Sequence, residues 1–217
     1  MDLIERIDAL IQDRHLLSHP FYARWREGTL PVEAIQEYTR QYYAFESAFP
    51  RLLSAIHSRT EDPVVRQSIL DNLWDEEHGE VNHAELWLRF AEGMGVARDE
   101  VHGAGANAGT QALMETYWGL ATDGSPAAGI AALYAYEAQV PEVAAEKING
   151  LRDRYGIDDA RTLAFFTVHS TLDLEHSGAE RDAIRRMTET EPAADAALAA
   201  TSRALDAWWG FLDAVNV

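Results

Sequence analysis

The chain has 217 residues, of which 47% are hydrophobic, and a formal net charge of −18 from 36 acidic and 18 basic side chains. This acidic balance, without a cluster of arginines and aromatic residues, argues against a nucleic-acid partner. The absence of cysteine excludes disulfides, thiolate metal sites and cysteine nucleophiles. No segment has the order of a signal peptide or the length of a membrane span, and no shift in composition divides the chain. We therefore expect one cytoplasmic domain over residues 1–217, with no membrane partner.

Helical spacing of apolar residues, with prolines and capping residues at the expected starts, predicts an all-α fold of about seven or eight helices. In chain order we expect helices over approximately residues 2–17, 20–27, 31–58, 62–94, 108–121, 126–154, 159–187 and 193–214. Pro50 and Pro141 should kink two of them, and a glycine-rich loop should precede residue 108. No segment alternates with the two-residue period of a strand.

One predicted helix carries several potential metal ligands beside its apolar stripe. Seven helical residues turn about 700°, so Glu76 and His83 should project from the same side of one continuous helix. Glu80 lies between them on that side and could replace or supplement Glu76, while Glu77 and His78 could support the ligands. The alternative is an acidic, solvated helix face.

A second group of candidate ligands lies downstream in apolar surroundings. His169, Asp173 and His176 are spaced i, i+4 and i+7, which places them on one helix face. Glu137 is a single acid in an otherwise apolar run, as expected of a carboxylate directed into a core, although a buried glutamate near the Pro141 kink would look the same. Burying these groups without a partner would cost several kcal/mol, and a bound cation would offset that cost.

The candidate ligands are three carboxylates and three imidazoles: Glu76, His83, Glu137, His169, Asp173 and His176. A mixed oxygen and imidazole set suits iron or manganese, whereas structural zinc usually takes four ligands and often thiolates. Six ligands are enough for two metal ions that share bridging carboxylates.

Lys147 is the only lysine in the chain, because the other basic side chains are arginines. A bias toward arginine codons accounts for most of this imbalance, and an exposed surface lysine is one interpretation of Lys147. An amine, unlike a guanidinium, can lose its proton and act as a nucleophile or nitrogen donor.

The motifs Glu-Glu-His-Gly-Glu-x-x-His and His-x-x-x-Asp-x-x-His, with the isolated Glu137 between them, resemble those of the haem-oxygenase-like dimetal oxidases. These helical proteins share a scaffold with TenA and PqqC. The resemblance spans nearly the whole chain and is strongest to the group that includes the Chlamydia protein associating with death domains, with His-Pro-Phe-Tyr near the start and a lysine beyond the third ligand.

This resemblance implies a haem-oxygenase-like helical bundle with an Fe/Fe or Mn/Fe centre, dioxygen as co-substrate and an external reductant. Members of the group are implicated in making para-aminobenzoate for folate from their own tyrosine, with a lysine as amino donor. By this resemblance Tyr22 is the sacrificed tyrosine and Lys147 is the nitrogen source.

Two other functions remain open at this point. The same metal site could oxidise a small external amine or fatty acid, which a polar opening beside Gly103 would favour. A non-catalytic interaction protein is the second alternative, but it leaves the buried ligands unexplained. A TenA-like thiaminase is disfavoured because its chemistry would need a cysteine nucleophile. The aromatic C-terminal helix would permit a homodimer.

Overall fold

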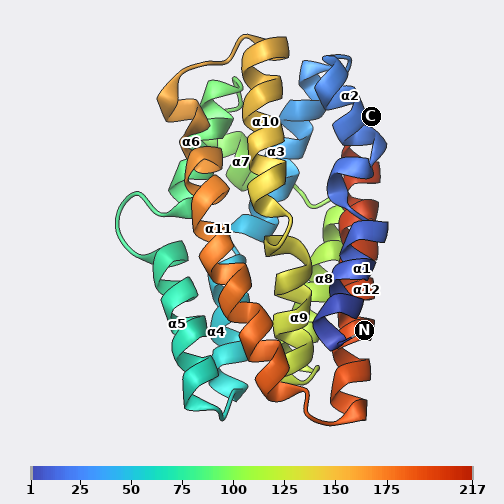
Figure 1. Cartoon of the computed structure of the whole chain (residues 1–217). Coiled ribbons are helices and arrows are strands. Elements are labelled where there is room, and N and C mark those ends of the chain that lie inside the picture. Colours follow the sequence, from blue (N-terminus) through green and yellow to red (C-terminus); the bar gives the residue numbers. More distant parts are fainter. Residues whose placement is uncertain (1, 217) are drawn as a thin grey trace.

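The computed structural model describes residues 2–216, apart from the side chains of residues 171–175. All regular secondary structure in this part of the chain is helical, which confirms the predicted all-α class, and the helices form the upright bundle of Figure 1. In chain order they are α1 (Leu3–Asp13), the 3-10 helix η1 (Leu16–Ser18), α2 (Pro20–Glu27), α3 (Val32–Glu46), α4 (Phe49–Arg59), α5 (Pro63–Glu77), α6 (His83–Gly93), α7 (Arg98–Gly103), α8 (Ala108–Thr122), α9 (Pro126–Glu137), α10 (Val140–Tyr155), α11 (Ala160–Met187) and α12 (Glu191–Val215).

The described residues form twelve α-helices, so the predicted number of seven or eight is too low. Three predicted helices are each divided in two, and α7 lies in the segment that was predicted as a loop. Pro50 and Pro141 lie in the first turns of α4 and α10, where a missing N–H is tolerated. Each proline therefore follows a helix break instead of kinking a continuous helix.

The third break separates α5 from α6 and lies inside the predicted ligand helix. The Gly79 backbone has a φ of 89°, a left-handed conformation that L side chains rarely adopt. The Asn82 side chain then accepts a hydrogen bond from the Glu85 backbone N–H and caps the new helix. A turn of chain consequently joins the two ligand-bearing segments.

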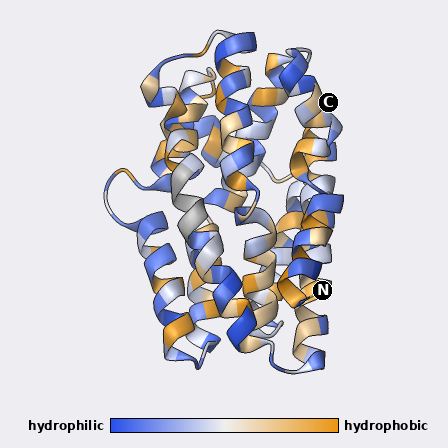
Figure 2. Cartoon of the chain, in the orientation of Figure 1, coloured by the Kyte–Doolittle hydropathy of each residue, from blue (hydrophilic) through white to orange (hydrophobic). Residues whose placement is uncertain are grey.

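Helix α9 lies at the centre of the bundle and is buried along its whole length from Ala127 to Glu137. It contacts α11 and α12, and α11 also contacts α5, α6 and α10. A helix that is apolar on all sides is expected to be surrounded by other helices. Figure 2 shows the contrasting pattern on the outer helices, where hydrophilic and hydrophobic residues are interspersed. Helix α9 thus delivers its terminal carboxylate, Glu137, to the interior.

Among the described residues, no helix is both long enough and apolar enough to cross a membrane.

Candidate metal centre

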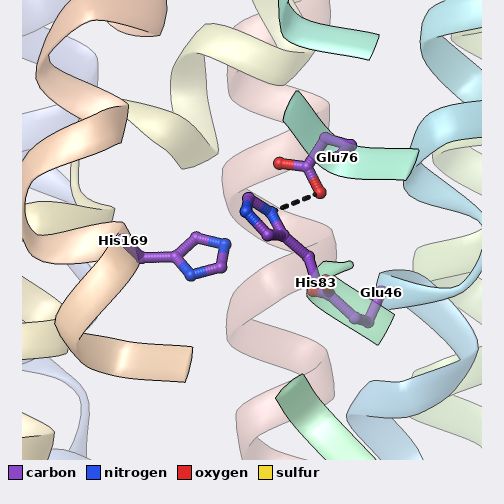
Figure 3. Close-up of side chains that lie close together, drawn as sticks. All are labelled: Glu46, Glu76, His83 and His169. Carbon is purple, nitrogen blue, oxygen red and sulfur yellow. Dashed lines mark ion pairs between the residues drawn. The ribbon is translucent and has the colours of Figure 1, made fainter. Parts of the chain in front are cut away.

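Two groups of buried side chains have potential ligand atoms within 4.8 Å of one another. The first group contains Glu46, Glu76, His83 and His169, and the second contains Glu76, Glu137 and His176. Figure 3 shows the first group converging from four helices, α3, α5, α6 and α11. Glu76 belongs to both groups, so its carboxylate is placed to contact two cations.

Glu76 and His83 meet across the break between α5 and α6. The His83 Nδ1 atom lies 2.8 Å from the Glu76 Oε2 atom, and both side chains are 4% exposed. The prediction of one continuous helix is wrong here: Glu76 is in the last turn of α5 and His83 is the first residue of α6. Glu80 lies exposed in the connecting segment and belongs to neither group of described ligands. The turn therefore brings Glu76 inward and leaves Glu80 in solvent.

The predicted supporting residues Glu77 and His78 are also exposed. The His78 ring stacks on Trp74 at a centroid separation of 3.9 Å. The structure does not bring either side chain into the two ligand groups.

His169 on α11 is oriented by its own helix. Its Nδ1 atom lies 2.7 Å from the Phe165 carbonyl oxygen, which can only accept, so Nδ1 carries the proton. The lone pair of Nε2 is then available as a ligand. Burial is the main reason that the pKa of His169 is lowered to about 4, and the nearby His83 ring, 4.4 Å away between centroids, contributes to the decrease. His169 is consequently neutral at physiological pH, as metal ligation requires.

The second group is held in place by hydrogen bonds from α5. Asn72 Nδ2 donates to both carboxylate oxygens of Glu137 at 3.1 and 3.3 Å. The His176 Nε2 atom lies 3.0 Å from Asp75 Oδ2, whereas its Nδ1 atom lies 3.9 Å from Glu137 Oε1. Since Asp75 engages Nε2, Nδ1 is the nitrogen directed toward the ligand group. A carboxylate on the outer nitrogen is the arrangement that fixes the tautomer of metal-bound histidines.

Asp173, the remaining predicted ligand, lies among the side chains outside the described part of the structure. Its role stays a prediction from the sequence. His169 and His176, seven residues apart on the unbroken α11, flank it on either side.

The donor set fits two divalent cations of the iron or manganese type. Three buried carboxylates and three imidazoles combine hard oxygen with borderline nitrogen, and no thiolate is present in the chain. Glu46, Glu76, Glu137 and His169 line a void of about 10 Å³, which is close to the space that one water molecule needs. Acidic groups buried this closely cost several kcal/mol without a counter-ion, and a divalent cation would offset that cost.

Glu46, the last residue of α3, is the member of the first group that the sequence analysis missed. It ends the run Tyr-Tyr-Ala-Phe and precedes Ser-Ala-Phe, so it is an isolated acid among apolar residues. The same signal identified Glu137.

Replacing Glu46 by glutamine should weaken metal binding and stabilise the metal-free protein. Removing one buried negative charge should raise the free energy of unfolding of the metal-free chain by about 1–3 kcal/mol. Affinity for the first metal ion should fall at least about tenfold, or 1.4 kcal/mol. Urea unfolding and competition with a chelator measure the two effects. Glu33→Gln, at an exposed position on the same helix, is the control. Loss of stability in metal-free Glu46→Gln would contradict this assignment.

The only lysine of the chain is buried in a cage of aromatic rings. Lys147 is 3% exposed, and its Nζ atom donates a hydrogen bond to the Tyr38 hydroxyl. Nζ lies 4.6 to 5.9 Å from the ring centroids of Tyr38, Phe166, Tyr42, Tyr22 and Trp87. Burial lowers the pKa of Lys147 from 10.5 to about 7, although the charge of Glu46 opposes part of this shift. The interpretation as an exposed surface lysine is wrong, and a large fraction of the amine is neutral near pH 7.

Lys147→Met should reveal this depressed pKa as a change in stability. Between pH 7 and 10.5 the unfolded chain binds a proton that the folded chain lacks, so the buried lysine makes the free energy of unfolding rise with pH. The variant should therefore be more stable than the wild type near pH 7. That advantage should shrink by about 1.4 kcal/mol per pH unit as the pH rises toward 10. Urea unfolding of both proteins at pH 7, 8 and 9 measures it; a pH-independent difference would contradict the buried, neutral amine.

Tyr22 borders the same cage from α2. It is 2% exposed, and burial raises the pKa of its hydroxyl, an effect that a hydrogen bond with Tyr38 partly offsets. His19 caps α2: its Nδ1 accepts from the Phe21 N–H at 3.0 Å, and its Nε2 lies 3.1 Å from Asp213 Oδ1. Because a capping Nδ1 must be unprotonated, Nε2–H donates to Asp213 and His19 is neutral. This cap fixes the start of the helix that positions Tyr22.

The chain is similar in sequence and in fold to proteins that are already known. The chain is 42% identical over 221 residues to a 4-aminobenzoate synthase of Nitrosomonas europaea, covering 98% of this chain and 90% of the relative. It is 40% identical over 213 residues to a 4-aminobenzoate synthase of Chlamydia muridarum, covering 98% and 89% respectively. A solved TenA homolog from Pseudomonas syringae pv. tomato superposes with a TM-score of 0.85 at 18% identity, over 98% of this chain and 90% of that structure. The last similarity concerns the fold alone.

The sequence profile of a haem-oxygenase-like family described as iron-containing redox enzymes matches residues 36–209. This segment includes every candidate ligand and Lys147, and it leaves Tyr22 outside. The match confirms the predicted haem-oxygenase-like fold and the enzyme class, and it agrees with a donor set suited to iron. The chain belongs to the haem-oxygenase-like family of iron-containing redox enzymes.

Proposed function

We propose that this protein is a 4-aminobenzoate synthase that consumes its own Tyr22 as the carbon skeleton and the Lys147 amine as the nitrogen source. The names of the relatives that are about 40% identical over nearly the whole chain support the product. The observation that carries the proposal is the burial of the only lysine within 5.9 Å of the Tyr22 ring centroid. Both reacting groups thus belong to the protein and already lie next to each other.

The proposed cofactor is an Fe/Fe or Mn/Fe pair. Glu46, His83 and His169 would hold one ion, Glu137 and His176 would hold the other together with Asp173, and Glu76 would contact both. When bound, these ions activate dioxygen and supply oxidising power toward a phenol, with electrons from an external reductant. Asn72 and Asp75 would keep the Glu137 and His176 side chains in their binding orientation, because each makes a hydrogen bond or close polar contact at 3.0 to 3.3 Å.

A continuous run of phenol rings connects Tyr22 with the metal centre. The Tyr22 hydroxyl interacts with that of Tyr38, which affects its pKa, and the Tyr38 ring stacks on Tyr42 at a centroid separation of 5.6 Å. The Tyr42 and Tyr136 hydroxyls are 2.6 Å apart, and both side chains line the void beside Glu76 and Glu137. Phenols in contact can pass an electron and a proton to one another. Electron and proton transfer along this run would oxidise Tyr22 without direct contact between Tyr22 and the metal ligands.

The aromatic cage prepares the Lys147 amine for transfer. Nitrogen transfer needs an unprotonated amine, and burial lowers the pKa of Lys147 to about 7. The Tyr38 hydroxyl accepts a hydrogen bond from Nζ and so fixes the position of the amine within the cage. The surrounding rings exclude water, which would otherwise compete for the oxidised phenol.

The stoichiometry of the product tests this proposal. The purified chain, supplied with iron and manganese, a reductant and oxygen but no organic substrate, should release 4-aminobenzoate up to about one equivalent per chain and then stop. Chromatography with mass detection measures the product. Many equivalents per chain, or product only after a small molecule is added, would contradict a self-consumed tyrosine.

The void of about 10 Å³ beside Glu46 and His169 has no room for a fatty acid. A non-catalytic interaction protein would have no use for buried carboxylates and imidazoles around such a void. The relatives with about 40% identity are named 4-aminobenzoate synthases, and this name favours neither alternative.

A further inference from the structure

A cavity of about 210 Å³ lies beside the second ligand group, among helices α4, α5, α9 and α11. Helices α5 and α9 each contact both α4 and α11, so the four helices form a closed ring around it. In Figure 1 they meet in the lower half of the bundle. His176, a proposed ligand, forms part of the cavity wall, as does Asn72, which donates to the Glu137 carboxylate. The cavity therefore adjoins the proposed metal centre.

The inner wall of this cavity is mainly aliphatic. Buried side chains from all four helices form it: Leu53, Ile69, Ile130, Leu133 and Ala183. An enclosed cavity of about 150 Å³ with apolar walls can stay dry and bind xenon or benzene. The wall therefore favours a small apolar occupant.

The polar residues of the inner wall do not turn their polar atoms toward the open space. The Asn72 Oδ1 atom and both carboxylate oxygens of Glu180 are inaccessible to solvent. The Ser68 hydroxyl donates to the Val65 carbonyl oxygen at 2.9 Å, and Asp75 engages His176 Nε2 at 3.0 Å. A polar molecule that entered here would exchange its hydrogen bonds with water for few replacements, which is costly. A molecule without hydrogen-bonding groups would pay no such cost.

One end of the cavity lies at the protein surface. Asp71 and Asp75 line this end and are exposed, whereas His176 lines the cavity at 7% exposure. The carboxylates at the surface disfavour the entry of anions and have little effect on a neutral molecule. The void inside the ligand group is only about 10 Å³, so a co-substrate must come from outside it. The cavity thus connects solvent with the surroundings of a proposed ligand.

We infer that this cavity admits dioxygen from solvent and holds it beside His176, as the access route to the metal centre. Dioxygen is small, neutral and apolar, so it matches the aliphatic wall and is not repelled by Asp71 and Asp75. The inference rests on the proposed function in one respect, because that reaction takes dioxygen as co-substrate. The affinity of the cavity for an apolar gas does not depend on the reaction and can be measured without metal.

Xenon is the probe for the cavity itself. Methyl NMR spectra of the metal-free full chain under increasing xenon pressure should show saturable shifts for Ile69 and Ile130. Ala179→Leu fills the cavity and should remove these shifts, and Ser68→Leu does the same from α5 if the first variant does not fold. Ala112→Leu, at an exposed position on α8, is the matched control and should keep them. Absence of these shifts in the wild type, or unchanged shifts in both filled variants, would overturn the inference.

The rate of iron oxidation tests the delivery of dioxygen without requiring the product. When the iron(II)-loaded chain is mixed with oxygenated buffer in a stopped-flow instrument, the observed rate should rise in proportion to the dioxygen concentration. Ala179→Leu, or Ser68→Leu in its place, should lower this second-order rate constant at least about tenfold. The amount of bound iron and the final extent of oxidation should not change, and Ala112→Leu should match the wild type. An unchanged rate constant in a filled variant that has lost the xenon shifts would overturn the access route.

The access route and the proposed function can fail separately. A wild-type chain whose iron oxidation is slowed by Ala179→Leu, but which releases no 4-aminobenzoate, would contradict the proposed function alone. A chain that releases 4-aminobenzoate, with iron oxidation equally fast in the wild type and the filled variants, would contradict the access route alone.

Discussion

Tyr22→Phe and Lys147→Arg should each reduce 4-aminobenzoate to background while leaving the metal content unchanged. Phenylalanine has no hydroxyl and so cannot be oxidised as a phenol. Arginine keeps a cation in the cage but cannot lose its proton or donate an amine. Product per chain, measured in a single-turnover assay with elemental analysis of bound metal, gives both results.

Tyr43→Phe is the matched control for the tyrosine, because Tyr43 is only partly buried and faces His102 at the end of another helix. It should retain wild-type yield. Product from Tyr22→Phe or Lys147→Arg at wild-type yield would show that the carbon or nitrogen comes from elsewhere. The assignment of the metal centre would still hold, but its substrate would be an external molecule.

Glu76→Gln should have the largest effect on metal binding, because Glu76 is the one described side chain in both ligand groups. An amide donates no negative charge to either ion, so bound metal should fall from two ions to less than one per chain. The wild type should gain about 2.7 kcal/mol of stability at a metal concentration one hundred times the dissociation constant. The variant should gain almost none. Elemental analysis and thermal unfolding with and without metal measure these effects.

Glu80→Gln removes the same charge from the exposed segment only four residues away and should keep both ions. Together the two variants test whether Glu76 or Glu80 is the metal ligand, because a continuous helix would place both on the same side. If Glu80→Gln lost metal and Glu76→Gln did not, the ligand assignment at the break between α5 and α6 would be wrong.

Helical periodicity predicted the parts of the site that lie on one unbroken helix. His169 and His176 share α11, where the spacing argument applies directly. The pairing of Glu76 with His83 was also predicted, yet the continuous helix on which that argument depended does not exist. Their contact depends on the left-handed Gly79 and the Asn82 cap, local features whose combined geometry a spacing rule cannot supply.

Other parts depend on tertiary contacts that the sequence does not reveal. Glu46 lies on α3, and its distance from the remaining ligands along the chain gives no hint of their proximity. Tyr38 and Tyr42 are both buried, and the Tyr38 hydroxyl accepts a hydrogen bond from the Lys147 amine, a contact that helical spacing does not predict. The sequence shows that Lys147 is the only lysine. Its burial results from the packing of α10 against α2 and α11, which the sequence does not reveal.

The amino group of the product should come from the protein itself, and one isotope experiment tests this directly. Because Lys147 is the only lysine, protein grown with lysine labelled by ¹⁵N at the ε position carries the label at a single known atom. After turnover in unlabelled buffer, mass spectrometry should find ¹⁵N in the released 4-aminobenzoate. Unlabelled product would contradict Lys147 as the nitrogen source.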